Sequence, residues 1–135
     1  MKILILITMF ISLNTIASES CNFLKGSYGL ESAKHATLII DINDDNLIVA
    51  KYRSPAQPTW FWDEYYVADG IIHDGENFQS GQEYKAICLN NTLNLTQRWN
   101  DTVFVSQYQI IGEKLVIKSK RDGVNSNDQI FIRIE

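Results

Sequence analysis

Apolar and polar residues alternate along most of the chain after its first twenty residues. In the segment HATLIIDI (35–42), the even positions are apolar and most odd positions are polar, with Ile39 as the exception. The final segment DQIFIRIE (128–135) shows the same period of two. Because successive side chains of a β-strand point to opposite faces, this period predicts half-buried strands rather than helices.

The alternating segments are separated by short connections rich in Asn, Asp and Gly, at 43–46, 69–70, 74–77, 90–91 and 111–113. These residue types tolerate positive φ and are typical of hairpin turns, so consecutive strands should be antiparallel neighbours. The pattern predicts strands close to residues 27–31, 35–42, 46–53, 59–68, 71–78, 82–89, 92–99, 102–110, 113–120 and 128–134.

A meander of this length would leave two long strand edges unpaired. Closing the sheet on itself removes both edges, so we expect an all-β, antiparallel up-and-down meander closed into a barrel of 8 to 10 strands. A two-sheet β-sandwich is the alternative architecture.

The first residues have the pattern of a secretory signal peptide. Lys2 is followed by an apolar run from Ile3 to Leu13 and then by small and polar residues. That run is too short to span about 30 Å of hydrocarbon as a helix. We therefore expect residues 1–17 to be a signal peptide, with cleavage after Ser20 as the alternative, and residues 18–135 to form one secreted or periplasmic domain.

Export makes a disulfide between the two cysteines possible, because disulfides persist in oxidising compartments. A bridge between Cys21 and Cys88 would tie the mature N-terminus to the middle of the chain. Lipidation of Cys21, as the first residue of a bacterial lipoprotein, is the other possibility, although Ser18-Glu19-Ser20 lacks the aliphatic residue of such a signal. We expect the disulfide.

A hairpin at Asn90 and Asn91 would place Cys88 on the inward face of its strand. The inward set would then be Tyr84, Ala86, Cys88, Leu93 and Leu95. The opposite face would be largely polar, which suits an exposed surface and supports a buried, structural Cys88.

The charge of the chain excludes some partners. It has 16 acidic residues against 12 basic ones, a formal net charge of −4 and no basic run. No segment could match the phosphate backbone of a nucleic acid, so we expect no nucleic-acid partner, and the short apolar run leaves no membrane span in the mature chain.

No segment has a complete catalytic or metal-binding motif. DINDDN (41–46) has oxygen ligands at the first, third and fifth places of a calcium loop, but it lacks Gly at the sixth place and Glu at the twelfth. His73, Asp74 and Ser80 lie close in sequence, yet nothing else supports a hydrolase. We expect a protein that is not an enzyme and that holds no metal or cofactor.

Both ends of the domain resemble lipocalin-like, calycin-type β-barrels. FLKGSYGL (23–30) looks like the opening strand of that family, in which an aromatic residue two places after a glycine plugs the barrel. The tail YQIIGEKLVIKSKRDG…DQIFIRIE resembles the closing strands, which carry an arginine that packs over the plug. The resemblance implies that Gly26 and Tyr28 match the opening motif and Arg133 the closing one, although Tyr28 stands where Trp is usual.

The segment TWFWDEYYV (59–67) is the most aromatic part of the chain. Strand alternation places Trp60, Trp62 and Tyr66 on one face together with Glu64, and Phe61 and Tyr65 on the other. A half-buried strand needs aromatic residues on one face alone. We therefore take these five aromatic residues as the candidate ligand-binding residues.

Three acceptor sequons begin at Asn90, Asn94 and Asn100. They are glycosylation sites only if the source is a eukaryote, which the sequence does not decide.

The fold-level resemblance implies an exported, non-enzymatic binding protein whose barrel holds a small apolar ligand. The alternative is a protein-binding module, such as an enzyme inhibitor that acts through loops and exposed aromatic residues. A barrel with an open interior favours the first function, and a filled barrel with an exposed aromatic patch favours the second.

Overall fold

The computed structural model describes residues 17–55, 61–74 and 82–134. These residues form one short 3₁₀ helix and eleven β-strands. Their bounds are η1 (Asn22–Leu24), β1 (Gly26–Leu30), β2 (Ala33–Ile42), β3 (Leu47–Arg53), β4 (Phe61–Val67), β5 (Ile72–Asp74), β6 (Gln82–Leu89), β7 (Thr92–Trp99), β8 (Thr102–Ile111), β9 (Lys114–Arg121), β10 (Val124–Asn125) and β11 (Gln129–Arg133).

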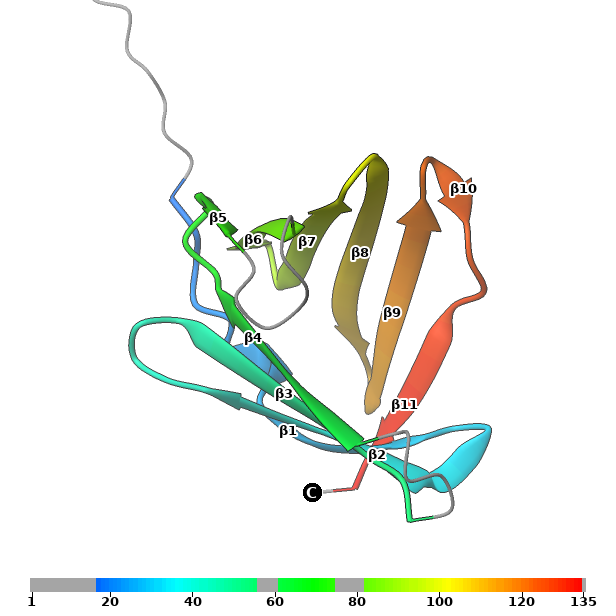
Figure 1. Cartoon of the computed structure of the whole chain (residues 1–135). Helices are drawn as coiled ribbons and strands as arrows, with labels where there is room; N and C mark the ends of the chain where they lie inside the picture. Colours follow the sequence, from blue (N-terminus) through cyan, green and yellow to red (C-terminus); the bar gives the residue numbers. More distant parts are fainter. Residues whose placement is uncertain (1–16, 56–60, 75–81, 135) are drawn as a thin grey trace, which may run out of the picture.

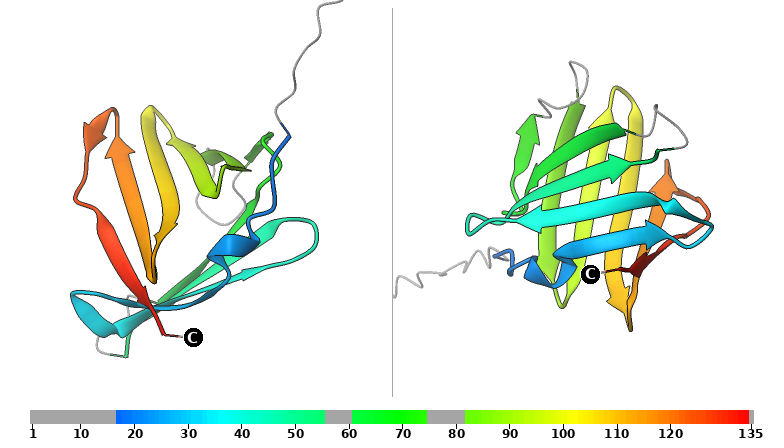
Figure 2. Two further views of the ribbon diagram at one scale, coloured as in Figure 1. Left: turned by 180° about the vertical axis from the view of Figure 1, so that it is seen from behind. Right: turned by 90° about the horizontal axis from the view of Figure 1, so that it is seen from below.

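The strands form one antiparallel up-and-down sheet, as the alternation predicted. Its order is β4-β3-β2-β1-β11-β9-β8-β7-β6-β5, and the two-residue strand β10 pairs with β9 beside this path. The layer of β1 to β4 crosses the layer of β6 to β9, and β11 joins the two layers by pairing with β1 (Figures 1 and 2). The fold is therefore a β-barrel made from one continuous sheet, and the sandwich alternative does not apply.

The barrel has a seam between β4 and β5, which are the two ends of the sheet in the described part of the chain. Asp69 and Gly70 turn the chain between the two strands, with Gly70 at a φ of 75°. Instead of a strand pairing, the Val67 N–H donates to the Tyr84 hydroxyl of β6 at 3.0 Å, and the Gly70 N–H donates to the Ala86 carbonyl at 2.9 Å. The predicted strand 71–78 is seen as β5, and residues 75–78 lie outside the described residues.

Fully buried side chains from η1, β2, β9 and β11 form one part of the hydrophobic core, which we call the closed end. Leu24 of η1, Leu38 of β2, Leu115 of β9 and Phe131 of β11 are all fully buried there. Burying such side chains removes apolar surface from water and is the main source of stability for the fold. Because η1 contributes Leu24, the segment before β1 acts as the plug of this end.

Tyr28 and Arg133 lie together at the closed end. The Tyr28 ring is fully buried, and its hydroxyl donates to the Leu24 carbonyl at 2.7 Å. The Arg133 guanidinium lies over this ring, 5.3 Å from its centroid, and donates to the same hydroxyl at 3.0 Å. Burial raises the pKa of Tyr28, while Arg133 acts in the opposite direction. Gly26 begins the same strand and pairs with Ile40 of β2.

The predicted disulfide between Cys21 and Cys88 is present. The two residues are 67 positions apart in sequence, their Cα atoms are 5.6 Å apart, and both are fully buried. Tyr84, Ala86, Leu93 and Leu95 are buried with Cys88, so the inward face predicted from the Asn90-Asn91 turn is confirmed. Since the bridge uses the Cys21 sulfur, lipidation of that atom is incompatible with this structure.

Asn46 joins three segments beside the disulfide. Its Nδ2 donates to the carbonyls of Glu19 at 2.8 Å and Ala68 at 2.9 Å, and its Oδ1 accepts from the Cys21 N–H at 2.9 Å. The residue itself has a φ of 60°, which Asn tolerates better than most side chains. The turn at 43–46 thus fixes both the N-terminal segment and the end of β4.

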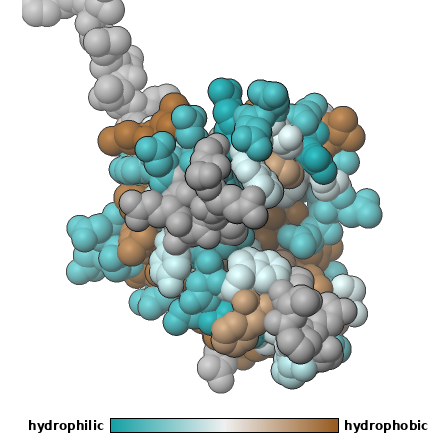
Figure 3. Space-filling model, viewed as in Figure 1, coloured by the Kyte–Doolittle hydropathy of each residue, from teal (hydrophilic) through white to brown (hydrophobic). Residues whose placement is uncertain are grey.

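The hairpin turns use the residues that the sequence singled out. Asn90 and Asn91 have φ values of 52° and 55°, and Gly112 has 63°. Asn90 and Asn100 lie exposed at turns, while Asn94 lies within β7 and its side chain accepts from Gln107 at 3.1 Å. On the face seen in Figure 3, apolar side chains are scattered among polar ones. None of the described helical segments is long and apolar enough to cross a membrane.

Candidate functional site

Polar and aromatic side chains meet inside the barrel, next to the core of the closed end, where Tyr52 pairs with Leu38. They come from both layers of the sheet, and we call them the inner polar cluster: Tyr52 of β3, Trp62, Glu64 and Tyr66 of β4, Gln97 of β7 and Tyr108 of β8. The register of β3 and β4 explains the first half of this set, because Tyr52 pairs with Trp62 while Glu64 pairs with the inward Ala50. Alternation then places Trp62, Glu64 and Tyr66 on one face.

Glu64 is the only acidic member of the inner polar cluster. The indole Nε1 of Trp62 donates to its Oε1 at 3.3 Å, and the Tyr66 hydroxyl forms a second hydrogen bond with the carboxylate. Burial raises the pKa of the Glu64 carboxyl above its ordinary value of 4.5, and these two hydrogen bonds lower it in part. The carboxylate is therefore oriented by neutral donors in a medium that disfavours its charge.

The tyrosines around Glu64 are linked to one another. Gln97 Nε2 donates to the Tyr66 hydroxyl at 2.9 Å, and Tyr52 and Tyr108 share a hydrogen bond. Burial is the largest cause that raises the pKa of Tyr52, Tyr66 and Tyr108, and the Glu64 carboxylate raises each pKa further. All three hydroxyls thus stay protonated and can donate to the carboxylate or to a ligand.

Aromatic packing holds the cluster in place. The Tyr52 and Trp62 rings stack with centroids 4.7 Å apart and an interplanar angle of 19°. Across the seam, the Tyr66 ring of β4 packs edge to face against the Tyr84 ring of β6, with centroids 5.2 Å apart. Such pairs stabilise a site beyond the area they bury, so the rings form a rigid wall.

Inward-facing side chains are less buried here than at the closed end. Trp62, Glu64, Gln97, Phe104 and Ser119 all keep intermediate exposure although strand alternation turns them inward. Further out, Trp99 of β7 is 43% exposed. Solvent therefore reaches the inward face of the sheet at this end, in contrast to the filled closed end.

The five predicted ligand-binding residues are divided by strand alternation. Trp62 and Tyr66 point inward, where Tyr66 is buried, and both belong to the inner polar cluster. Phe61 and Tyr65 point outward and are 68% and 38% exposed. Trp60 lies outside the described residues. Outside the barrel, the Arg53 guanidinium lies over the Phe61 ring at 4.0 Å and pairs with Asp63 at 2.7 Å.

The predicted set did not contain Tyr52, Glu64, Gln97 and Tyr108. For Glu64 the signal was available, because alternation placed it with Trp62 and Tyr66. Tyr52 and Tyr108 also occupy inward positions of alternating segments. Their contact with Glu64 depends on how the two layers of the sheet cross, and a local sequence pattern does not predict that crossing.

His73 has a different partner from the one that the sequence suggested. Its Nε2 lies 2.8 Å from Asp69 Oδ2 rather than beside Asp74, and its ring stacks on Tyr84 with centroids 5.2 Å apart. Ser80 lies outside the described residues. Within the described ranges, no group of three or more His, Cys, Asp or Glu side chains could hold a metal ion.

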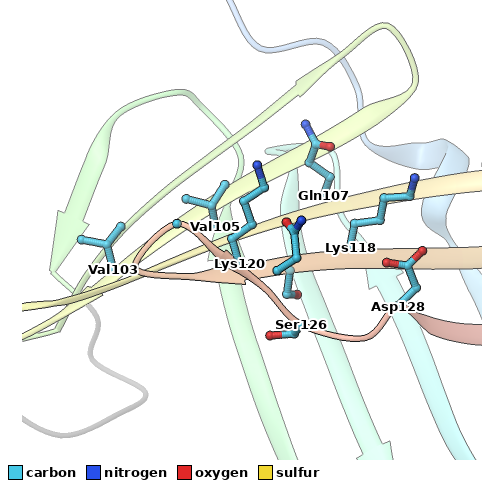
Figure 4. Close-up of a pocket in the computed structure, with 10 residues that line it drawn as sticks. Val103, Val105, Gln107, Lys118, Lys120, Ser126 and Asp128 are labelled. Atoms are coloured by element: carbon cyan, nitrogen blue, oxygen red, sulfur yellow. The ribbon is translucent and has the colours of Figure 1, made fainter.

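A separate hollow lies on the outer face of the barrel. It has a volume of about 530 Å³ and lies between the outward faces of β8 and β9 and the connection from β10 to β11 (Figure 4). Val103, Val105, Lys118 and Lys120 form its floor, and Ser126 and Asp128 lie at its side. Its lysines are exposed side chains of a solvated face, and none of the inner polar cluster lines it.

Comparison with known proteins gives a fold without a sequence family. No protein-family model matches the chain, and no significant match was found among curated proteins. Solved structures do match: the wild-type fluorescent protein UnaG has a TM-score of 0.64 and 16% identity over 83% of this chain and 98% of that one.

Two further matches are proteins named for fatty acids. Fatty-acid-binding protein 1 of Echinococcus granulosus has a TM-score of 0.64 at 10% identity, over 83% of this chain and 98% of its own. The fatty acid transporter REP1-NXSQ has a TM-score of 0.65 at 15% identity, over 84% and 97%. At these identities the likeness concerns the fold alone. The chain thus has the β-barrel fold of these three proteins.

Proposed function

We propose that the protein is an exported, non-enzymatic carrier that holds a small apolar ligand inside its barrel. The observation that carries this proposal is the inner polar cluster, where Trp62, Glu64 and Gln97 face inward with partial exposure beside the buried Tyr52, Tyr66 and Tyr108. A core built only for stability has no need of a carboxylate and an amide at inward positions. An apolar wall with a few convergent polar groups is instead typical of small-molecule sites.

The comparisons support the same class of function. Barrels of this fold include proteins named as a fatty-acid-binding protein and a fatty acid transporter. Export is supported by the pattern of residues 1–17 and by the disulfide, which is typical of oxidising compartments.

A protein-binding role is the second candidate, and one observation favours it. Phe61 is 68% exposed, and Arg53, held by Asp63, covers one face of its ring. Aromatic residues and arginines are enriched where proteins bind one another.

Native mass spectrometry of the protein purified from its own host, without detergent, separates the two candidates. The carrier function predicts a retained small mass that is released on denaturation. A protein that co-purifies in stoichiometric amount, with no small mass, would contradict the carrier function and favour the second candidate.

A further inference from the structure

The charge of the inner polar cluster restricts the polar group that a ligand can carry. We propose that the barrel selects apolar molecules that carry a protonated amine, with the Glu64 carboxylate as the group that binds the ammonium. This proposal rests on the proposed function, because it assigns a ligand class to the same interior.

Glu64 has no cationic partner within the described part of the chain. The ion pairs there join Lys25 with Asp41, Arg53 with Asp63, His73 with Asp69 and Lys114 with Glu31. None includes Glu64, and its hydrogen-bond partners Trp62 and Tyr66 are neutral. A partly buried carboxylate without a counter-ion costs folding free energy, and a ligand with a positive charge would supply the missing partner.

Two arginines of the sheet, Arg133 of β11 and Arg121 of β9, are engaged with other side chains. Arg133 lies over Tyr28 and donates to its hydroxyl at the closed end. Arg121, which pairs with Phe104 in the sheet register, lies 5.6 Å above that ring and is exposed. Within the described residues, neither arginine forms an ion pair with Glu64 that would neutralise it.

Side chains from three strands surround the Glu64 carboxylate. Trp62 and Tyr66 fix the carboxylate from its own strand, while Tyr52 and Tyr108 face it from β3 and β8. A carboxylate has about four acceptor positions, so the two donors leave acceptor positions that an ammonium group can use. Trp62 also stacks on Tyr52, and an aromatic ring face that a ligand reaches attracts a cation rather than an anion.

The same features act against a ligand carboxylate. A second anion beside Glu64 would be repelled in a medium of low dielectric, and one of the two groups would have to take up a proton. The interior should therefore discriminate between amphiphiles that differ only in their polar end.

The test compares dodecylamine, dodecanol and dodecanoate as competitors of the uncharged dye N-phenyl-1-naphthylamine, with the mature chain at pH 7.5. We expect dodecylamine to displace the dye at a concentration at least about tenfold lower than dodecanoate, with dodecanol between them. In Glu64→Gln this preference for the amine should disappear, while dodecanol binding stays the same. Glu83→Gln, which removes an exposed carboxylate from the outward face of β6, should keep the preference.

A measurement on the unmodified chain gives a second route. The amine preference should shrink as the pH falls through the raised pKa of Glu64, because the carboxyl loses its charge. The other groups that face it, Tyr52, Tyr66 and Tyr108, stay protonated throughout. The Glu64→Gln variant, which keeps every other titratable group, serves as the control for effects of pH that do not involve Glu64.

The outcomes separate the two proposals. Dye binding with equal or better competition by dodecanoate, or an amine preference that survives Glu64→Gln, would overturn the amine selectivity and leave the carrier function standing. If neither the dye nor any of the three competitors binds, the carrier function fails, and the amine selectivity fails with it.

Discussion

The backbone N–H of Val67, at the end of β4, donates across the seam to the hydroxyl of Tyr84 in β6, at 3.0 Å. This side chain takes the place of a strand partner at the seam, where the two end strands of the described sheet, β4 and β5, are not paired. Tyr84 is 8% exposed and also contacts the Tyr66 ring, so it joins the seam to the inner polar cluster.

Replacement of Tyr84 by Phe should destabilise the barrel. The change leaves the Val67 N–H without its acceptor in a part-buried position, which costs about 1–3 kcal/mol of unfolding free energy. Urea denaturation measures the difference. Tyr65→Phe is the matched control, because Tyr65 is 38% exposed and its hydroxyl lies 3.4 Å from Asp63, and its expected effect is below about 0.5 kcal/mol. Equal effects of the two changes would contradict the role of Tyr84 at the seam.

Reduction of the Cys21–Cys88 bridge should lower stability by about 4 kcal/mol, because the bridge closes a loop of 67 residues in the unfolded chain. Denaturation with and without reductant measures this loss. Thiol titration of the denatured, unreduced protein should find no free sulfhydryl group. Two free thiols would refute the bridge.

Asn46 should matter through its side chain rather than its backbone. Asn46→Gly keeps the positive φ but removes three hydrogen bonds, to Glu19, Cys21 and Ala68, so we expect a loss of about 1–3 kcal/mol. Asn90→Gly changes another asparagine of positive φ whose side chain is exposed, and should cost less than about 0.5 kcal/mol. Thermal denaturation of both variants is the check, and similar losses would argue against the anchoring role.

Glu64 should make the empty barrel less stable as the pH rises. Its pKa in the fold is raised above the ordinary value of 4.5, so between these two values the folded state binds more protons than the unfolded state. Unfolding free energy should therefore fall as the pH rises through this window and stay lower above it. In Glu64→Gln this fall is absent, so the difference between variant and unmodified chain should grow from pH 4 towards neutral pH. A difference that is constant with pH would show that Glu64 titrates normally.

Local patterns predicted the strands and most of their faces. In β11 they did not, because Phe131 is fully buried while Ile134, on the face of alternating isoleucines, is 56% exposed. Alternation placed Trp62 inward and Phe61 outward, and it placed Cys88 where a bridge could form. Asn90 and Asn91 predicted their hairpin because few other residues adopt positive φ in consecutive positions. Both successes depend on residues that lie within a few positions of one another.

Contacts between distant segments could not be predicted in this way. Asn46 binds the N-terminal segment through its side chain, and nothing in a turn of Asn and Asp residues indicates that partner. Likewise, Glu64 lies on a predicted inward face, but its meeting with Tyr108 depends on how the two layers cross. The contact across the seam is also a contact between distant positions, because the Val67 N–H donates to the hydroxyl of Tyr84, 17 residues further along the chain.

The carrier function is tested most directly by blocking the interior. Gln97→Trp adds a large side chain to the inward face of β7 beside Tyr66, while Thr96→Trp adds the same side chain to the exposed face of the same strand. Titration with N-phenyl-1-naphthylamine should show saturable binding of one dye to the unmodified chain and to Thr96→Trp. Binding to Gln97→Trp should be weaker by at least about tenfold, or about 1.4 kcal/mol. Equal affinity in the two variants, or no saturable binding to the unmodified chain, would contradict a ligand site inside the barrel.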